Sequence, residues 1–467
     1  MRRHGEATTQ RSAPRRPTGA TLLGIGLAVT LVTSACTGDP GSGASPGGGG
    51  SETIPQPTVP RDVPVAPESD RVDLTLPTFS NPTNVTNPLF PVSQQESVLL
   101  LGHVDGKPFR TEVTLLPNTR IIEWQGLRVE TLISQYVAYL DGRIQEVAYD
   151  YYAQADDRSV WYFGEDVFDF RDGVIVVTEG TWLAGKDGPA AMIMPGDPHV
   201  GDVYRTENAP GFVFEEVTVK SVGETLDGPL GPIDGGMLAD ELHSDGKVEQ
   251  KIFAPGYGEF FTGGGGDVEA LALGVPTDRL SGTLPTELTT LSSGALDIFE
   301  TAGLGNWKAA SATVADMAAD WETYRGAGVP RLIEPRMSGA LGALTSAVEV
   351  RSAARVRNAA IEVARSSFDL RLLYRPATEI DLARLDLWAA QLLVDAAAED
   401  AAAVNADAFA LDYVRDRILH ALDSADLTRV NVDLGAIQIA VVDEDLPAAA
   451  DAAAHLRSIL AGLQPAS

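Results

Sequence analysis

Asp-Gly dipeptides recur in the middle of this 467-residue chain and constrain its fold more than any other sequence feature. Seven of them occur between residues 105 and 246. Four of these, at Asp105-Gly106, Asp141-Gly142, Asp172-Gly173 and Asp245-Gly246, separate runs in which apolar and polar residues alternate. Asp-Gly accommodates the positive φ angles of type I′ turns, and the alternation gives each strand one apolar face. The pattern therefore predicts a series of antiparallel β-hairpins.

The clearest predicted hairpin joins Tyr136–Leu140 to Arg143–Ala153, where Val147, Tyr149 and Tyr151 share one face at period two. Further strands are expected at 174–177, 212–222, 248–254 and 268–273. We expect residues 77–280 to form an antiparallel meander of about ten or more strands. A barrel, half-barrel or sandwich is the favoured shape, because each removes or shelters strand edges.

Several blocks of this region resemble those of a known family. They are Asn87–Pro91, Trp161–Asp166 (WYFGED), Thr181–Gly188 (TWLAGKDG), Ile193–Pro195 (IMP), Gly201–Arg205 (GDVYR) and Ala254–Gly258. In order and spacing they are similar to the recurring blocks of a bacterial family of secreted β-domains of unknown function. The resemblance covers about residues 80 to 275. It implies a β fold and an exported setting, and it implies no activity.

Past about residue 285 the hairpin signals stop and alanine-rich patterns with helical spacing begin. Seven helices are predicted, at 306–325, 332–348, 352–373, 379–398, 404–423, 428–442 and 446–464. Residues 290–467 therefore predict an all-α helical bundle with short loops. The fold class is α+β and multidomain, with the β meander first and the bundle second.

An internal repeat is predicted within the bundle. Leu341–Val348 aligns without gaps with Leu434–Val441, 93 residues further on, and the same offset pairs Ala359-Ala360 with Ala452-Ala453. Two three-helix units joined by the 379–398 helix would fit this offset. Apolar residues on two sides of that helix, such as Leu387 and Trp388, are typical of a central helix.

The N-terminus has the three parts of a secretory leader. Five arginines lie between residues 2 and 16, an uncharged apolar run spans 20–32, and small residues precede Cys36. The apolar run rises only about 20 Å as a helix, short of the roughly 30 Å hydrocarbon core of a membrane. Val32–Cys36 resembles a bacterial lipobox, with a departure at Thr33. We expect residues 1–35 to be a lipoprotein signal peptide and Cys36 to carry lipid, palmitate included, on the extracytoplasmic face of the cell membrane.

Residues 36–76 are rich in Gly, Pro, Ser and Thr, and they predict a disordered spacer behind the anchor. Cys36 is the one cysteine of the chain, which excludes a disulfide framework. The formal net charge is −30, so the surface repels nucleic acid and anionic lipid. The expected membrane contact is therefore the lipid on Cys36 alone.

Catalytic signatures are absent from the sequence. Gly43–Gly47 matches Gly-x-Ser-x-Gly, but it falls in the spacer rather than at a strand-to-helix turn, and Gly263–Gly266 opens no predicted helix. Asp412, Asp416 and His420 stand at four-residue steps on one predicted helix, which suggests a carboxylate and imidazole metal site. An exposed polar stripe that pairs with Arg415 and Arg417 is the alternative.

Aromatic residues supply the candidate ligand cavity of the β region. Tyr149, Tyr151, Trp161, Phe163 and Trp182 would line an apolar cleft if the sheet is hollow, and they would fill the core if it is not. Glu165, Asp166 and Asp169 lack the spacing of a calcium loop.

Three classes of function remain open from the sequence. The favoured one is a non-catalytic cell-envelope lipoprotein that binds a small hydrophobic ligand or an envelope protein. The second is an envelope metal-handling protein that uses the helical domain, and the third is an unrecognised enzyme. The sequence requires no cofactor.

Overall fold

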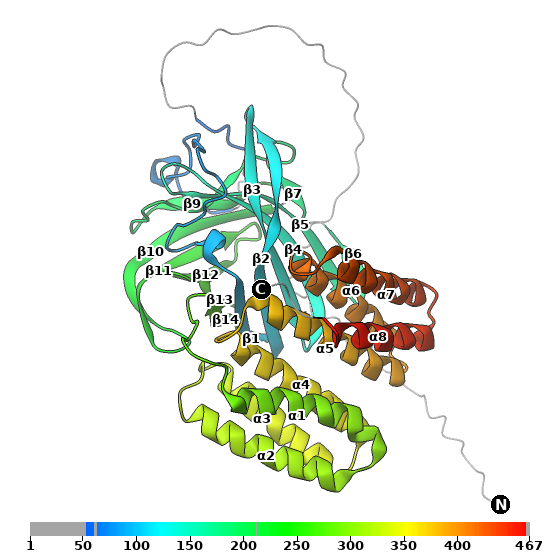
Figure 1. The fold of residues 1–467 in the computed structure, drawn as a ribbon. Helices are drawn as coiled ribbons and strands as arrows, with labels where there is room; N and C mark the ends of the chain where they lie inside the picture. The colour runs from blue at the N-terminus through cyan, green and yellow to red at the C-terminus, as the bar shows by residue number, and fades with distance from the viewer. Residues whose placement is uncertain (1–52, 60–62, 179, 212, 464–467) are drawn as a thin grey trace, which may run out of the picture.

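The structure, a computed structural model, describes residues 53–59, 63–178, 180–211 and 213–463. An antiparallel sheet occupies the first part of these residues and helices occupy the second, as the sequence predicted. Figure 1 shows the sheet with two groups of helices, α1–α4 below it and α5–α8 beside it. Among the described residues, no helix is both long enough and apolar enough to cross a membrane.

A single open sheet of fourteen strands forms the β part of the described chain. Its main path runs β6-β5-β4-β3-β2-β1-β14-β13-β12-β11-β10-β9, and β7 and β8 both pair with β5. The strands are β1 (Ser97–Val104), β2 (Lys107–Trp124), β3 (Leu127–Leu140), β4 (Arg143–Gln154), β5 (Val160–Arg171), β6 (Val174–Val177), β7 (Trp182–Leu183), β8 (Ala191–Met194), β9 (Val203–Ala209), β10 (Val213–Asp227), β11 (Pro232–His243), β12 (Val248–Ala254), β13 (Gly258–Gly264) and β14 (Asp267–Val275).

The Asp-Gly turns form as expected at three of the four predicted positions. Both residues have positive φ at 105–106, 141–142 and 172–173, which is the geometry of type I′ hairpins. At 245–246 only Gly246 has positive φ, and His243 and Lys247 close a longer turn through a backbone hydrogen bond. The β2–β3 turn uses Gln125-Gly126 with the same two positive φ angles.

The segment before the sheet is ordered over part of the predicted spacer. Ile54 is buried in the β core, and Arg71 forms a buried ion pair with Asp73. The Asp73 carboxylate also accepts a hydrogen bond from the backbone N–H of Arg205 on β9. Apolar and charged side chains within residues 53–59 and 63–76 of the predicted spacer therefore contact the sheet.

Eight helices follow, one more than predicted. They are α1 (Thr286–Thr301), α2 (Trp307–Arg325), α3 (Glu334–Glu349), α4 (Ala353–Arg371), α5 (Ala377–Ala397), α6 (Ala401–Ile418), α7 (Ser424–Val442) and α8 (Leu446–Leu460). The missed helix, α1, begins after Pro285 and buries Leu288, Leu291, Ala295 and Ile298 at helical spacing.

The helix boundaries follow the 93-residue offset seen in the sequence. Helices α5, α6, α7 and α8 begin 91, 94, 90 and 93 residues after α1, α2, α3 and α4, as differences of their first residues. The packing agrees, because α1 contacts α2 and α4, and α5 contacts α6 and α8. The arrangement is two units of four helices rather than two units of three, with the 379–398 helix opening the second unit.

Both helical units pack against the same side of the sheet. Leu99, Leu101 and Leu273 of the sheet belong to one core with α1–α5, and Val137, Tyr139 and Phe170 belong to another with α5–α8. Alternating residues such as Leu100 and Leu271 point to the other side, where they form clusters without helix residues. We call these two sides the helix side and the inner side of the sheet.

Candidate ligand-binding sites

A cavity of about 690 Å³ forms a groove between α3 and α4. Arg110 of β2 reaches its inner end, and Val350 lies near the C-terminal end of α3. This volume falls in the range of small-molecule pockets, roughly 300–1,000 Å³. The groove belongs to the helical part of the molecule, whereas the sequence directed attention to a cleft in the β part.

Small residues of α3 create the groove. Gly339, Ala340, Ala343 and Ala347 line it at helical spacing, so the middle of this face of α3 carries side chains no larger than a methyl group apart from Ser346. Ile333, Val350 and Ala359 add further apolar surface. The resulting lining can contact an unbranched hydrocarbon chain along the helix. Arg336 and Arg365 lie at one polar end, and Arg355 and Asn358 near the start of α4 are further polar residues of the lining.

Arg336 is the first of two arginines at that polar end. Its Nη2 donates a 3.2 Å hydrogen bond to the carbonyl oxygen of Phe109. The charges of Asp369 and Glu362 act on its guanidinium, but no carboxylate of the described residues forms a direct ion pair with it. Burial and the neighbouring charge of Arg110 lower the pKa of Arg336. The guanidinium therefore sits in a site where an anion would stabilise it.

Arg365 of α4 is the second arginine. Its guanidinium lies 4.7 Å from the ring centroid of Trp388, an arrangement that favours a cation. The Nε atom is buried without a hydrogen-bond acceptor, and it lies 3.4 Å from the exposed carboxylate of Glu362. Arg336 and Arg365 both line the groove, and the Arg365 charge contributes to the lowered pKa of Arg336.

Directly behind the groove lies a charge-balanced cluster, which we call the arginine network. It consists of Arg110, Glu112, Asp369, Asp381, Arg384 and Arg417, on β2, α4, α5 and α6. All six side chains are less than one-tenth exposed. Arg110 donates to Glu112 and Asp369 at 2.6–2.7 Å, and Arg417 donates to Glu112 at 2.6 Å. The network fixes the helices on the sheet and has no charge to spare for a ligand.

The inner side of the sheet carries a second group of buried charges, and here carboxyl groups are in excess. We call this group the acidic interior: Glu146, Asp150, Glu165, Glu207, Glu215, Glu241, Glu249, Glu259 and Glu269. Glu165 on β5 and Glu207 on β9 hydrogen-bond each other, although their strands lie near opposite ends of the sheet. The sheet is therefore curled, so that its two ends face each other across this interior.

Burial dominates the protonation of the acidic interior. It raises the pKa of Asp150, Glu241 and Glu269 to about 7, and that of Glu146 to about 8. Neighbouring carboxylates raise these pKa values further, Glu215 acting on Glu241 and Glu259 on Glu269. His243 and Lys251 are the cations that the described residues place among them.

A second, smaller cavity opens on this interior. It measures about 100 Å³ and is lined by Tyr136, Asp150, Tyr152, Glu259 and Glu269 among others. This is room for a few water molecules rather than for a lipid. The inner side of the sheet is thus hollow on a small scale, and apolar side chains such as Val98 and Leu100 line the hollow together with the carboxyl groups.

The five aromatic residues predicted to line a ligand cavity lie elsewhere. Trp161, Phe163 and Trp182 are fully buried in the β core. The Tyr149 hydroxyl donates to Asp416 of α6, and the Tyr151 hydroxyl donates to Asp166. None of the five lines the two cavities described above.

The predicted helical metal site does not assemble as expected, because α6 ends at Ile418 and His420 lies in the following turn. Gln438 donates to Asp412 at 2.8 Å, and Arg415 pairs with Asp416 at 2.9 Å. The three residues do not form a group with metal-ligand spacing; within the described residues that spacing occurs at Glu215, Glu241 and His243. Cys36, the predicted lipid attachment site, lies outside the described residues.

Sequence reasoning missed both Arg336 and Arg365. The sequence feature that could have identified them is weak, because it consists only of two arginines on alanine-rich helices in a strongly acidic chain. The sequence matches no protein-family model and no curated protein.

Proposed function

We propose that this protein binds an anionic amphiphile, a molecule with one hydrocarbon chain and a carboxylate or phosphate head, in the groove between α3 and α4. The head would lie between Arg336 and Arg365, and the chain would lie along the small residues of α3. This proposal assigns a site to the small hydrophobic ligand that the sequence favoured. It makes the protein a non-catalytic binding protein.

The observation that carries the proposal is Arg336, which lines the groove and forms no direct ion pair with a carboxylate of the described residues. Arg110, in the same groove, is held by Glu112 and Asp369, whereas Arg336 has a single neutral acceptor, the Phe109 carbonyl. In a chain of net charge −30, acidic partners for an arginine are abundant. A bound anion would supply charge-assisted hydrogen bonds to both guanidinium groups, and such bonds are about twice as strong as neutral ones.

The expected setting supports the same ligand class. We infer from the leader and from Cys36 that the mature chain is lipid-anchored on the extracytoplasmic face of a bacterial membrane. Amphiphiles with acidic heads are constituents of that compartment. A tethered protein that holds one of them would act as a carrier or a sensor in the cell envelope.

Calorimetric titration of the full chain with dodecanoate tests the proposal. We expect saturable binding with about one ligand per chain, and weaker binding of dodecanol, which lacks the charge. Acetate and inorganic phosphate, which lack the chain, should bind weakly as well. Dodecyl phosphate should bind like dodecanoate, since both heads suit paired arginines.

Two substitutions locate the binding site. Arg336→Gln should weaken dodecanoate binding about tenfold or more, because a hydrogen bond to a charged group contributes about 1.5–3 kcal/mol. Ala343→Leu should block the groove, and Ala436→Leu is its matched control at the equivalent position of α7, 93 residues on. Equal affinity for dodecanol and dodecanoate, or unchanged binding in both groove variants, would contradict the proposal.

A further inference from the structure

The second inference concerns the inner side of the sheet, at the β10–β11–β12 edge of the acidic interior. Glu215 lies opposite His243 in the β10–β11 pair, and Glu241 lies opposite Glu249 in the β11–β12 pair. Directly opposed residues of antiparallel strands project to the same side. Strand pairing therefore brings one imidazole and three carboxylates together, without any loop.

The separations in this cluster are those of metal ligands. Single donor atoms of Glu215, Glu241 and His243 all lie within 4.8 Å of one another. His243 Nδ1 is 3.2 Å from a Glu215 oxygen, and Nε2 is 3.9 Å from Glu241 and 3.6 Å from Glu249. Zinc bonds to nitrogen and oxygen of about 2.0–2.2 Å place tetrahedral ligand atoms about 3.4 Å apart. Small side-chain shifts would therefore let one ion contact three of these residues.

Hydrogen bonding already orients the ligands. Whichever ring nitrogen of His243 binds an ion, the other still faces a carboxylate, either Glu215 or Glu249. A carboxylate behind the imidazole is the usual outer partner of a metal-bound histidine. The Thr206 hydroxyl lies 3.2 Å from Glu215 and 3.3 Å from Glu241, between the two carboxylates.

A separate observation also points to a cation. Glu207 is only 6% exposed and faces Glu215 in the β9–β10 pair, on the same side of the sheet. Its Oε2 atom has no hydrogen-bond partner in the described part of the chain, and neither has Nε2 of His243. Buried polar atoms are rarely left without partners, so these two atoms indicate a missing ligand.

Lys251 is the competing cation. Its Nζ lies 3.3 Å from Glu241 and 3.4 Å from Glu259. The ammonium can therefore keep Glu259 when another cation takes Glu241. The side chains of His243 and Glu215 are 23% and 20% exposed, which leaves a path from solvent to the cluster.

We propose that Glu215, Glu241 and His243 form a binding site for a divalent transition-metal ion, with Zn²⁺ as the ion that suits this nitrogen and oxygen donor set best. His243 is a cation when the site holds no metal, so the ion displaces one ring proton to solvent as it binds. Glu249 positions the imidazole, and Lys251 occupies part of the site in the ion's absence. The site is distinct from the groove between α3 and α4, and either can exist without the other.

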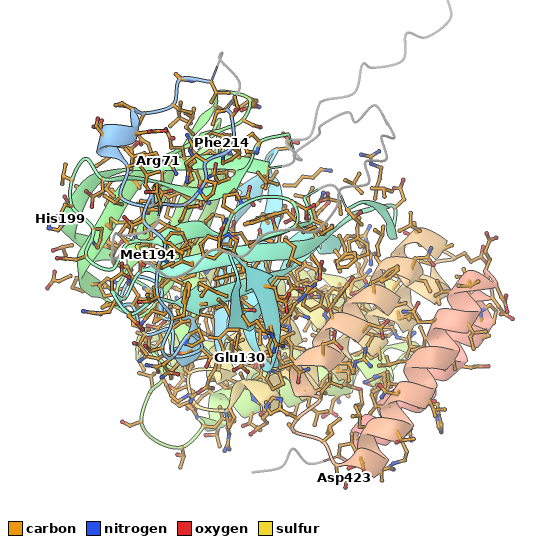
Figure 2. All side chains as sticks on the ribbon, turned by 90° about the horizontal axis from the view of Figure 1, so that it is seen from above. Arg71, Glu130, Met194, His199, Phe214 and Asp423 are labelled. Carbon is orange, nitrogen blue, oxygen red and sulfur yellow. The ribbon has the colours of Figure 1, made fainter. Side chains whose placement is uncertain are left out.

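Calorimetric titration of the full chain with Zn²⁺ tests this inference, and Mg²⁺ serves as the comparison ion. We expect about one Zn²⁺ per chain, with Mg²⁺ binding much more weakly because it prefers all-oxygen octahedral sites. His243→Ala and Glu241→Gln should each weaken Zn²⁺ binding at least tenfold. His199→Ala is the matched control, since His199 lies near two carboxylates but is exposed at the outer edge of the β part (Figure 2).

Two further measurements test the inference even if His243→Ala or Glu241→Gln fails to fold. Lys251→Met should bind Zn²⁺ more tightly, because it removes the competing ammonium. Co²⁺ bound to the unmodified protein should show the intense visible absorption of a tetrahedral site. Absence of stoichiometric Zn²⁺ binding overturns the inference, and so does Zn²⁺ binding that is unchanged in both His243→Ala and Lys251→Met.

Discussion

On the helix side of the sheet, three arginines meet three carboxylates; on the inner side, His243 and Lys251 are the cations that the described residues place in the acidic interior. The arginine network is buried between β2 and the helices, whereas the acidic interior is buried or half-buried on strands of the sheet. In the arginine network, the guanidinium charges overcome burial and hold the pKa of Glu112 well below its usual value. In the acidic interior burial prevails, and the pKa of Glu146 rises to about 8.

The difference separates a structural role from a binding role. Balanced charges satisfy each other, so the arginine network can fix the helices on the sheet but has nothing to offer a ligand. Unbalanced charges must be neutralised by protons, by ligands or by ions. By the same criterion we propose the groove, where Arg336 has no direct ion pair among the described residues, as the site for an anion.

Disrupting the arginine network should have the largest effect on the free energy of unfolding. Arg417→Met removes a fully buried arginine and leaves Glu112 and Asp381 with less compensation. We expect a loss of about 3–5 kcal/mol in the free energy of unfolding, because the remaining charges stay buried. Urea denaturation measures this loss. Arg429→Met, at an exposed pair with Asp426 on α7, is the control and should change little.

The pH dependence of stability should reveal the acidic interior. Asp150, Glu241 and Glu269 have pKa values of about 7 in the folded chain, above their unfolded values, so the folded state holds more protons between about pH 5 and 7. Stability therefore falls as the pH rises through this window. We expect the melting temperature to be highest near about pH 5 and clearly lower at pH 8. A melting temperature that rises steadily from pH 5 to pH 8 would contradict the excess of buried carboxyl groups.

Replacing one carboxyl group of the acidic interior with a neutral amide should change this pH dependence of stability. Glu146→Gln removes a carboxyl group whose pKa is about 8, so its ionisation no longer costs folding free energy at high pH. We expect the variant to be more stable than the parent by about 1–3 kcal/mol at pH 9, with little difference at pH 5. Denaturation at the two pH values measures the change, and a variant that is less stable at both would show that Glu146 makes a necessary contact.

Exposed charges on the same sheet should matter least. Lys220 and Asp240 form a 3.0 Å pair on β10 and β11, and both side chains are about half exposed. Lys220→Ala should therefore change the free energy of unfolding by less than about 0.5 kcal/mol. A larger loss would mean that burial is not what separates the charges that matter from those that do not.

Local signals explain why much of the fold was predictable. Asp105-Gly106 and Asp141-Gly142 specify turns by backbone conformation alone, and period-two alternation identifies the strands between them. Helix α1 was not predicted from the sequence because its segment has few charged residues and begins soon after the last strand. His420 was misplaced because the spacing of Asp412, Asp416 and His420 continues beyond Ile418, where the helix ends.

The candidate sites could not be predicted, because each depends on contacts between distant parts of the chain. Arg336 meets the carbonyl of Phe109, 227 residues away, and nothing in the sequence pairs them. The carboxyl groups of Glu165 and Glu207 meet only because the sheet curls. Figure 2 shows how far the sheet and helices extend, with His199 at the edge of the β part and Asp423 at the far end of the helical part. Which charges remain unbalanced is a property of the assembled structure.

The most direct test of the proposed anion site uses dodecanoate labelled with ¹³C at its carboxyl carbon. Its NMR signal, followed against pH in the presence of the full chain, reports the pKa of the bound head group. Two guanidinium groups should lower that pKa below the value for free dodecanoate in the same buffer, and Arg336→Gln combined with Arg365→Gln should abolish the difference. A bound carboxyl group that titrates like the free one, or the same lowered pKa in the double variant, would contradict the assignment of the groove.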